Sequence, residues 1–309
     1  MARRPTALWL TGLLLACQSP PDFATGAGPG RDEPSSCDEV TAVPDQVVQE
    51  LKLDTDFYGR HCQALGIDVL GSSRVPDAAM LEAGRVLEGV FEQRAELRDA
   101  VHDRYFRVVL VASSAGEELD DVPELGDLRK VERMAAGLGP DAYFPAATVR
   151  DSAVLCRPAD KDPNATPPGD TLVHELGHAL LSMGLVEVDP GFEERLIQAF
   201  EGARAAGTWA IEVPPVVEVL FGELPSATHM MGDHEEYWAT GVSAWFGFKP
   251  LPLSYALTDD DPPGIQLQVV YGRDALRGHD PALADLLEEV FGPSPGLRPS
   301  CVEWIPRYR

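Results

Sequence analysis

The sequence feature that most constrains this chain is the pentapeptide His174-Glu175-Leu176-Gly177-His178. Residues four positions apart lie on one face of a helix, so both imidazoles can reach a single zinc ion. Glu175 directly follows the first histidine and can lie beside a metal-bound water as its general base. Asp170 is a suitable N-cap for a helix over residues 171–183, with Gly184 as its C′ residue.

Apolar residues flank the pentapeptide on both sides: Leu172, Val173, Ala179, Leu180 and Leu181. They indicate that the segment is buried, and an unpaired pair of buried histidines would be costly. The alternative is an amphipathic helix whose two histidines face solvent. Gly177 keeps the helix surface small where another element must pack.

A hydrolytic zinc site takes a third protein ligand and leaves one position for water. The third histidine of the metzincin spacing is absent, because position 184 is glycine. A ligand must therefore come from farther along the chain. The best candidates lie in a helix predicted over residues 233–246, which has aromatic and small residues on one face and acids at its N-terminal end.

Residues 236–246 closely resemble the segment Glu-Tyr-Trp-Ala-Glu-Gly-Val-Gln-x-Trp-Phe of a family of exported zinc peptidases. That family is distantly similar to the catalytic domain of anthrax lethal factor. Its arrangement is the gluzincin one, in which a glutamate on a second helix completes the zinc site. The likeness covers most of the globular part through short matches at residues 56–58, 66–67, 75–77, 137–139, 171–175 and 280–283.

The resemblance implies a zincin-like metallopeptidase domain with Zn²⁺ as cofactor. The ligands it implies are His174, His178 and Glu236, with Glu175 as general base. Glu235 is the rival to Glu236 as third ligand. An aromatic-rich core helix over the same residues is compatible with this role.

Two departures from the family pattern stand out. Thr240 occupies the position of a glutamate that commonly orients a zinc histidine from the second coordination shell, so metal affinity or turnover is expected to be reduced. The Pro-containing stretch 211–226 is longer than in relatives, and it is a candidate to line or cover the cleft. The sequence also does not identify the residue that would donate a hydrogen bond to the oxyanion of the transition state. The candidates are His229, His234 and Tyr143, and His229 is favoured because a tyrosine stands near that position in lethal-factor-like enzymes.

The N-terminus indicates export. Two arginines precede an apolar run over residues 7–16, which is too short to span a bilayer and is typical of a signal peptide. Leu14-Leu15-Ala16-Cys17 resembles the lipobox of bacterial lipoproteins, in which the cysteine is acylated. We therefore expect residues 1–17 to end at a lipidated Cys17 and the protein to lie in the bacterial cell envelope, anchored to the outer membrane. An ordinary signal peptide is the alternative.

Strands are predicted over residues 106–111 and 149–155, and helices over residues 77–97, 171–183, 192–206, 233–246 and 281–290. This order predicts the α+β class, with a small mixed sheet followed by a mainly helical half. By analogy with related folds, the strand over 149–155 is the candidate edge along which an extended peptide pairs. Residues 18–45 are predicted to be a flexible tether, and residues 46–309 a single domain.

The formal net charge is −25, which argues against nucleic acid as a partner. Four cysteines besides Cys17 predict two disulfides in an exported protein: Cys37, Cys62, Cys156 and Cys301. Three connectivities are possible.

These features together predict zinc-dependent hydrolysis of peptide bonds in a cell-envelope or extracellular protein. Two alternatives remain. One is a catalytically inactive, zinc-stabilised envelope binding module, suggested by Thr240 and by the unidentified oxyanion donor. The other is a structural lipoprotein that needs no metal.

Overall fold

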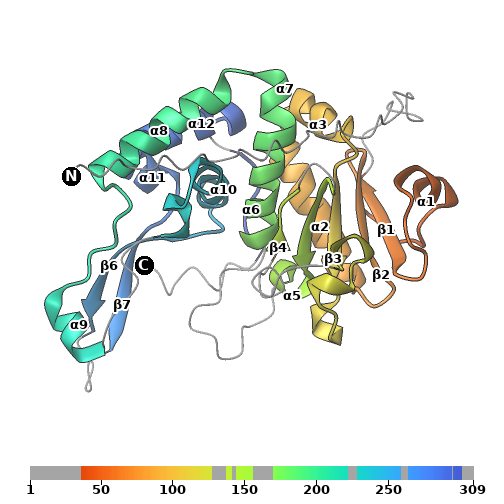
Figure 1. The fold of residues 1–309 in the computed structure, drawn as a ribbon, viewed down its shortest axis with the longest axis horizontal. Coiled ribbons are helices and arrows are strands. Elements are labelled where there is room, and N and C mark those ends of the chain that lie inside the picture. The colour runs from red at the N-terminus through yellow and green to blue at the C-terminus, as the bar shows by residue number, and fades with distance from the viewer. Residues whose placement is uncertain are drawn as a thin grey trace, which may run out of the picture.

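A mixed five-stranded sheet forms the N-terminal half of the fold, and helices form most of the C-terminal half (Figure 1). The predicted α+β class is therefore confirmed. The computed structural model describes residues 36–126, 137–140, 144–155, 170–221, 228–258, 264–293 and 295–300.

The sheet has the strand order β1-β2-β3-β5-β4. Its strands are β1 Tyr58–Ala64, β2 Ile67–Ser72, β3 Arg107–Val111, β4 Gly137–Leu138 and β5 Ala146–Arg150. β1 and β2 form an antiparallel hairpin, β3 is parallel to both β2 and β5, and β4 is antiparallel to β5. Every residue of β3 is buried, as is usual for a strand inside a parallel sheet, so the strand predicted over 106–111 is confirmed.

The strand predicted over residues 149–155 is wrong in position and in role. β5 begins at Ala146 and ends at Arg150, and Asp151–Val154 forms the helical turn α5. The buried Asp151 carboxylate accepts hydrogen bonds from Ser113 Oγ at 2.7 Å and from the Ser114 amide at 3.0 Å, which stabilise this turn. Because β5 pairs with β3 and β4, the sheet edge on this side is β4 in the described residues.

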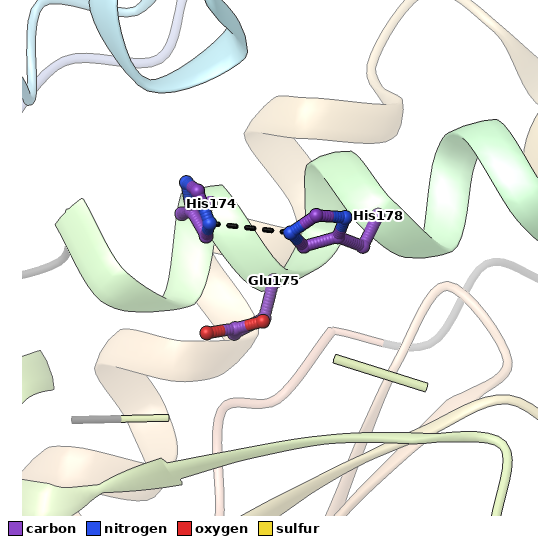
Figure 2. A group of neighbouring side chains, drawn as sticks. All are labelled: His174, Glu175 and His178. Carbon is purple, nitrogen blue, oxygen red and sulfur yellow. Dashed lines mark hydrogen bonds between the residues drawn. The ribbon is translucent and has the colours of Figure 1, made fainter. Parts of the chain in front are cut away.

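Helix α6, Asp170–Ala179, carries His174, Glu175 and His178 (Figure 2). The chain then passes through a π-helical turn, Leu180–Leu185, into α7, Val186–Val188. Gly184 therefore does not end the helix as predicted. It lies where α3, Ala95–His102, packs, since a Cβ at position 184 would lie 3.4 Å from the side chain of Leu97.

Helix α2, Asp77–Phe91, follows the predicted helical period and buries Met80, Ala83, Leu87 and Val90. The prediction of a single helix as far as Leu97 is wrong. The chain leaves helical geometry at Arg94, where φ is −131°, and Leu97 belongs to the separate helix α3.

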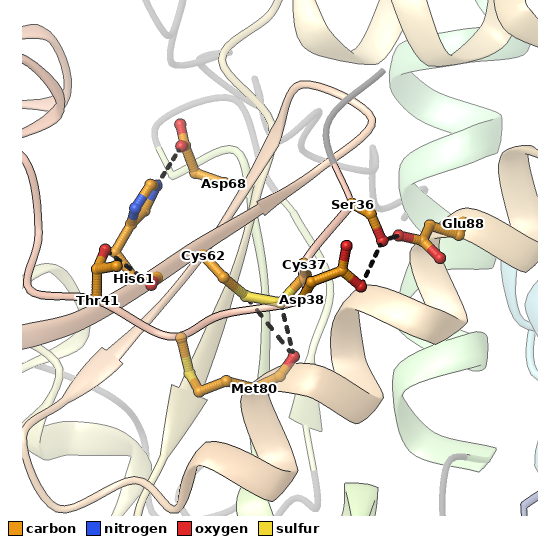
Figure 3. The surroundings of a disulfide bond; sticks show 9 residues. All are labelled: Ser36, Cys37, Asp38, Thr41, His61, Cys62, Asp68, Met80 and Glu88. Carbon is orange, nitrogen blue, oxygen red and sulfur yellow. Dashed lines mark hydrogen bonds and ion pairs between the residues drawn. A yellow bond between two sulfur atoms is a disulfide. The ribbon is translucent and has the colours of Figure 1, made fainter. Parts of the chain in front are cut away.

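A disulfide between Cys37 and Cys62 ties the N-terminal segment to β1 (Figure 3). Both sulfurs lie near the Met80 carbonyl oxygen of α2, and Thr41 forms a backbone bridge to His61. The flexible tether predicted over residues 18–45 is therefore too long, because residues from Cys37 onward are attached to the fold. Closing this 25-residue separation stabilises the folded state by about 3 kcal/mol in the chain-entropy account. Cys17, Cys156 and Cys301 lie outside the described residues.

Within the described residues, the C-terminal half contains five helices: α8 Phe192–Ala206, α9 Pro215–Phe221, α10 His234–Trp245, α11 Arg273–His279 and α12 Pro281–Phe291. The predicted helices over 192–206, 233–246 and 281–290 are confirmed. The antiparallel hairpin of β6, Leu251–Leu257, and β7, Ile265–Val270, was not predicted. The first helix of the described residues is α1, Asp45–Leu51. Four short 3-10 turns complete the described elements: η1 Ser113–Ala115, η2 Leu119–Asp121, η3 Pro123–Leu125 and η5 His229–Met231.

The described part of the Pro-containing stretch 211–226 packs on the β6–β7 hairpin. The Glu212 amide donates to the Leu253 carbonyl at 2.8 Å, and the Tyr255 amide donates to the Glu212 carbonyl at 3.0 Å. α9 also contacts β6. Among the described helices, none combines the length and apolar character needed to cross a membrane.

The Asp280 carboxylate organises the helical half from inside. It is 4% exposed, accepts hydrogen bonds from Tyr237 Oη at 2.7 Å and Trp209 Nε1 at 2.8 Å, and caps α12 through the Leu283 amide at 3.2 Å. Three donors therefore satisfy this buried carboxylate. The network fixes α10, which carries Tyr237, against the start of α12.

Helices α6 and α10 approach each other most closely at Gly177. A Cβ at position 177 would lie 2.7 Å from the Ala239 Cα atom. Beside this contact, the buried Trp238 indole donates a hydrogen bond of 3.0 Å to the Gly177 carbonyl oxygen. The prediction that Gly177 keeps the helix surface small for a neighbouring element is confirmed.

We expect Gly177→Ala to lower the free energy of unfolding by about 1–3 kcal/mol, because the added methyl group must push two helix backbones apart. Gly202→Ala on α8 is the matched control, since a Cβ there meets nothing within 4 Å. This control should be stabilised by up to about 1 kcal/mol through helix propensity. Urea denaturation of both variants measures the difference, and equal changes in the two would contradict the close approach of α6 and α10.

Candidate metal centre

The two histidines of the pentapeptide lie one helical turn apart on α6 and face each other through their Nε2 atoms, 3.2 Å apart (Figure 2). Their rings are in an edge-to-face arrangement with centroids 4.8 Å apart. The side chains are 13% and 16% exposed for His174 and His178. One side of the pair is therefore open to a cavity, and the alternative of two solvent-facing histidines does not describe this arrangement.

Glu236 comes from the first turn of α10, and its backbone is fixed by a capping interaction. The Asp233 carboxylate accepts a hydrogen bond of 2.8 Å from the Glu236 amide, which defines where the helix begins. The Glu236 carboxylate lies 3.2 Å from His174 Nε2 through Oε2 and 3.7 Å from His178 Nε2 through Oε1. Glu235 is exposed at the rim of the cavity and forms no ion pair with either imidazole in the described part of the chain.

The separations among these atoms match a tetrahedral ligand set. With zinc–nitrogen and zinc–oxygen bonds of about 2.0–2.1 Å, two ligands of a tetrahedral ion lie about 3.3 Å apart. The observed separations are 3.2 Å between the two Nε2 atoms, 3.2 Å from His174 Nε2 to Glu236 Oε2 and 3.7 Å from His178 Nε2 to Glu236 Oε1. The two imidazoles therefore approach different oxygens of one carboxylate, and the three side chains are close enough to share one ion.

The polar groups at this point satisfy one another only in part. The two histidine Nε2 atoms form a hydrogen bond of 3.2 Å, in which one ring donates and the other accepts. Glu236 Oε2 is buried, and none of its contacts with the described residues has the geometry of a hydrogen bond, although two imidazole nitrogens lie within 3.2 Å. A cation between them would satisfy all three side chains, so the donor set fits a metal ion.

Glu175 lies beneath the histidine pair and is 7% exposed. One ligand atom each from His174, Glu175 and His178 lies within 4.8 Å of the others. Burial raises the pKa of the Glu175 carboxyl to about 7, and the charges of Glu236 and Asp170 act in the same direction. The group is therefore poised between its acid and base forms near neutral pH.

The backbone of β4 and the following turn covers the Glu175 carboxylate. A Cβ at Gly137 would lie 3.0 Å from Oε1, and a Cβ at Gly139 would lie 3.2 Å from Oε2. The Gly139 position would also crowd the His178 Cβ atom at 3.2 Å. Glycine at both positions therefore lets the edge strand lie directly against the base.

The ionisation of the ligand groups suits metal binding. Burial, together with the neighbouring His174, lowers the pKa of His178 to about 4, which keeps its imidazole neutral. Burial acts to raise the pKa of Glu236, but the close contact with His174 and the charges of the neighbouring histidines outweigh it and lower the pKa to about 2. At neutral pH the pair therefore offers a free imidazole lone pair and an ionised carboxylate, the forms that bind zinc.

These groups line a cavity of about 550 Å³. The other lining residues come from both halves of the fold: residues 137–140, Asp170, Thr171, Leu181, Ser182, His229, Glu235 and Lys249. No described residue of the stretch 211–226 lines it, so the expectation that this stretch lines the cleft is not met there. The volume is in the range of small-ligand and substrate clefts.

The candidate oxyanion donors fall in different places. His229, in η5, is 80% exposed, and its Nε2 lies 3.1 Å from Glu236 Oε2. His234 instead contacts Glu193 Oε1 at 3.2 Å and does not line the cavity. Tyr143 lies outside the described residues. Of the three, the structure brings His229 to the metal centre.

Thr240 lies one turn after Glu236 and is 3% exposed. Its Oγ1 atom and the Nδ1 atom of His174 are both buried without a hydrogen-bond partner. Among the described residues, the outer nitrogen of His174 therefore has no acceptor of the kind that usually orients a zinc histidine.

Sequence reasoning missed one ionic contact at the cavity. Lys249 Nζ lies 3.1 Å from Asp170 Oδ2, and the Asp170 side chain is only 3% exposed. Asp170 was predicted as a helix cap, and it is the first residue of α6. Lys249 carried no sequence signal, because it follows α10 after a turn at Gly247 with φ of 78°.

The chain matches no protein-family model. It also matches no curated protein.

We expect Glu175→Gln to stabilise the metal-free protein in a pH-dependent way. The folded-state pKa is about 7 against an ordinary value of 4.5, so wild-type stability is fully present below 4.5 and is lost as the pH rises through 7. Glutamine carries no charge and escapes this loss, which amounts to about 3 kcal/mol at most. Urea denaturation of chelator-treated protein on both sides of this window measures it, and a constant difference between variant and wild type would contradict burial as the cause.

Proposed function

We propose that this protein is a zinc-dependent metallopeptidase of the gluzincin type, with a zincin-like domain. The observation that supports this most directly is the tetrahedral spacing of His174, His178 and Glu236 around one point, with the buried Glu175 carboxylate beside it. A site with three protein ligands leaves a position for water, as hydrolytic zinc sites do. The family resemblance of residues 236–246 supports the same activity.

Zinc, when bound, supplies Lewis-acid polarisation of the scissile carbonyl and lowers the pKa of water to about 7. Glu175 accepts the proton of the attacking water and returns it to the leaving amine. Its pKa of about 7 suits both transfers, because a group that gains and loses a proton in one cycle works best near the ambient pH. His229 is exposed and close to Glu236, and in this proposal it donates a hydrogen bond to the developing oxyanion.

The proposed substrate is an extended peptide or protein segment. β4 is the described sheet edge nearest the metal centre, and residues 137–140 line the cavity. An extended chain that pairs with β4 as an added strand would pass directly over Glu175, because glycines 137 and 139 leave no side chain between them. In this proposal, the sheet edge that pairs with the peptide is therefore β4 and not the strand predicted over residues 149–155.

The proposed location is the bacterial cell envelope, with a lipid anchor at Cys17. The lipobox resemblance of residues 14–17 supports it, and the Cys37–Cys62 disulfide agrees with an oxidising compartment. Peptides or proteins of that compartment are the proposed substrates, and nucleic acid is not a proposed partner.

A second candidate function is an inactive, zinc-stabilised binding module. The buried and unpartnered Thr240 Oγ1 and His174 Nδ1 atoms favour it, since a zinc histidine without an outer partner is less well oriented for catalysis. Both candidates require the same metal ligands, so only the role of Glu175 separates them.

We expect Glu175→Gln to keep one zinc per chain and to lower peptide hydrolysis by at least about 100-fold, because the general base is lost. Glu236→Gln should lose stoichiometric zinc, whereas the neighbouring control Glu235→Gln should retain both zinc and activity. Metal analysis and cleavage of a peptide library measure these effects.

The results separate the candidate functions. Stoichiometric zinc in the wild type without cleavage of any library peptide would overturn the enzyme and leave the binding module. Zinc retained by Glu236→Gln and lost by Glu235→Gln would overturn the ligand assignment. Purified protein without zinc, and without a change of stability on chelation, would overturn both candidates.

A further inference from the structure

A second cavity, of about 320 Å³, lies at the other end of α10 and shares no lining residue with the metal centre. Its walls come from the end of α10, the start of α11 and the segment after α12. They consist of aromatic residues, glycines, a proline and two arginines: Trp245, Phe246, Gly247, Tyr271, Gly272, Arg273, Arg298 and Pro299. None of the described residues that line it is acidic.

The two arginines of this cavity carry charge without acidic partners. Neither Arg273 nor Arg298 forms an ion pair within the described part of the chain, and Arg298 Nη1 donates only to the carbonyl oxygens of residues 295 and 297. By contrast, the nearby Arg277 is paired with Glu288 at 2.6 Å. Two unpaired guanidinium groups stand out in a protein whose formal net charge is −25.

Two buried donors beside them also lack acceptors. Trp245 is 1% exposed, and its Nε1 atom has no hydrogen-bond partner among the described residues. The Arg273 Nη1 atom is likewise buried and unpartnered. The Arg273 guanidinium lies 5.9 Å from the centroid of the Trp245 ring, so these donors belong to one cluster. Such groups are costly to bury unless an acceptor reaches them.

The local electrostatics agree with this geometry. Burial lowers the pKa of Arg273, and the positive charges of Arg298 and Arg277 lower it further, against the opposing effect of the Asp274 carboxylate. A bound anion would relieve that repulsion. Because guanidinium groups bind carboxylates through paired hydrogen bonds, a carboxylate suits the arginines, and an apolar body suits the Trp245, Phe246 and Pro299 walls.

We propose that this cavity, the Trp245 pocket, binds a small organic carboxylate with an apolar or aromatic body, held between Arg273 and Arg298. The pocket is separate from the metal centre. Trp245 follows Glu236 by nine residues, which is about two and a half turns and about 13 Å along the helix, so the two side chains leave α10 on opposite faces. The inference does not rest on the proposed hydrolase activity.

Titration calorimetry of the intact protein tests this proposal with N-acetyl-phenylalanine as probe. Its carboxamide has the same body without the charge, and inorganic phosphate has the charge without the body. We expect the acid to bind at least about tenfold more tightly than either. Arg273→Gln and Arg298→Gln should each weaken the binding of the acid by about tenfold or more.

Three further variants make the result specific. Arg204→Gln on α8 removes an exposed arginine elsewhere and should leave acid binding unchanged. Glu236→Gln should also leave it unchanged, which separates the Trp245 pocket from carboxylate binding at the metal centre. Trp245→Phe keeps the aromatic wall and removes the indole donor. This variant should therefore bind the acid more weakly and still fold.

The proposal is overturned if the carboxamide binds as tightly as the acid, if phosphate binds more tightly, or if both arginine variants bind the acid like the wild type. Loss of acid binding in Glu236→Gln alone would assign the signal to the metal centre and would also overturn it. Far-UV circular dichroism checks that each variant is folded. Arg298→Gln, at an exposed side chain, keeps the test decisive if Arg273→Gln does not fold.

Discussion

The geometry of the metal centre depends on the close packing of α6 against α10 at Gly177. Both zinc-ligand histidines proposed here lie on α6 and the carboxylate lies on α10, so the separation of the two helix axes sets the separation of the ligands. A glycine against Ala239 allows the backbones to meet, and the Trp238–Gly177 hydrogen bond of 3.0 Å holds them in register. The direct backbone contact and the buried hydrogen bond together set the distance between the two helices, and with it the spacing of the proposed ligands.

The site also depends on both halves of the fold, and each contributes a different property. The sheet half contributes β4, whose glycine backbone lies against one side of Glu175, and the burial of this carboxylate is what raises its pKa to about 7. The helical half contributes Glu236, whose position is fixed by Asp233 at the start of α10 and by the Asp280 network farther along the helix. The proposed base and the proposed third ligand are thus positioned independently, since no side chain is shared between the two supports.

The sequence predicts those parts of the site that are encoded by local spacing. The pentapeptide places two imidazoles on one helical face by periodicity alone, and Asp233 and the aromatic residues after it mark a second helix. The covering of Glu175 by residues 137–139 could not be predicted physically, because β4 has two residues and its pairing with β5 is set by long-range contacts. The same reason explains the misplaced strand over 149–155, since Asp151 ends β5 through hydrogen bonds to Ser113 and Ser114. The sequence allows three connectivities for its four cysteines other than Cys17, so it could not predict that Cys37 pairs with Cys62.

Helix α10 connects the two cavities, and their charges are complementary to different ligands. Its N-terminal end presents the carboxylates of Glu235 and Glu236 to one cavity, and its C-terminal end presents the Trp245 indole to a cavity lined by two unpaired arginines. A cation at the first end and an anion at the second would each satisfy buried groups that now lack partners. Each ligand would stabilise the folded state only through its own affinity. Coupling through a displacement of α10 would have to break the close contact at Gly177 or the hydrogen bonds of Asp280, which oppose such a movement. The packing of α10 therefore favours two independent sites.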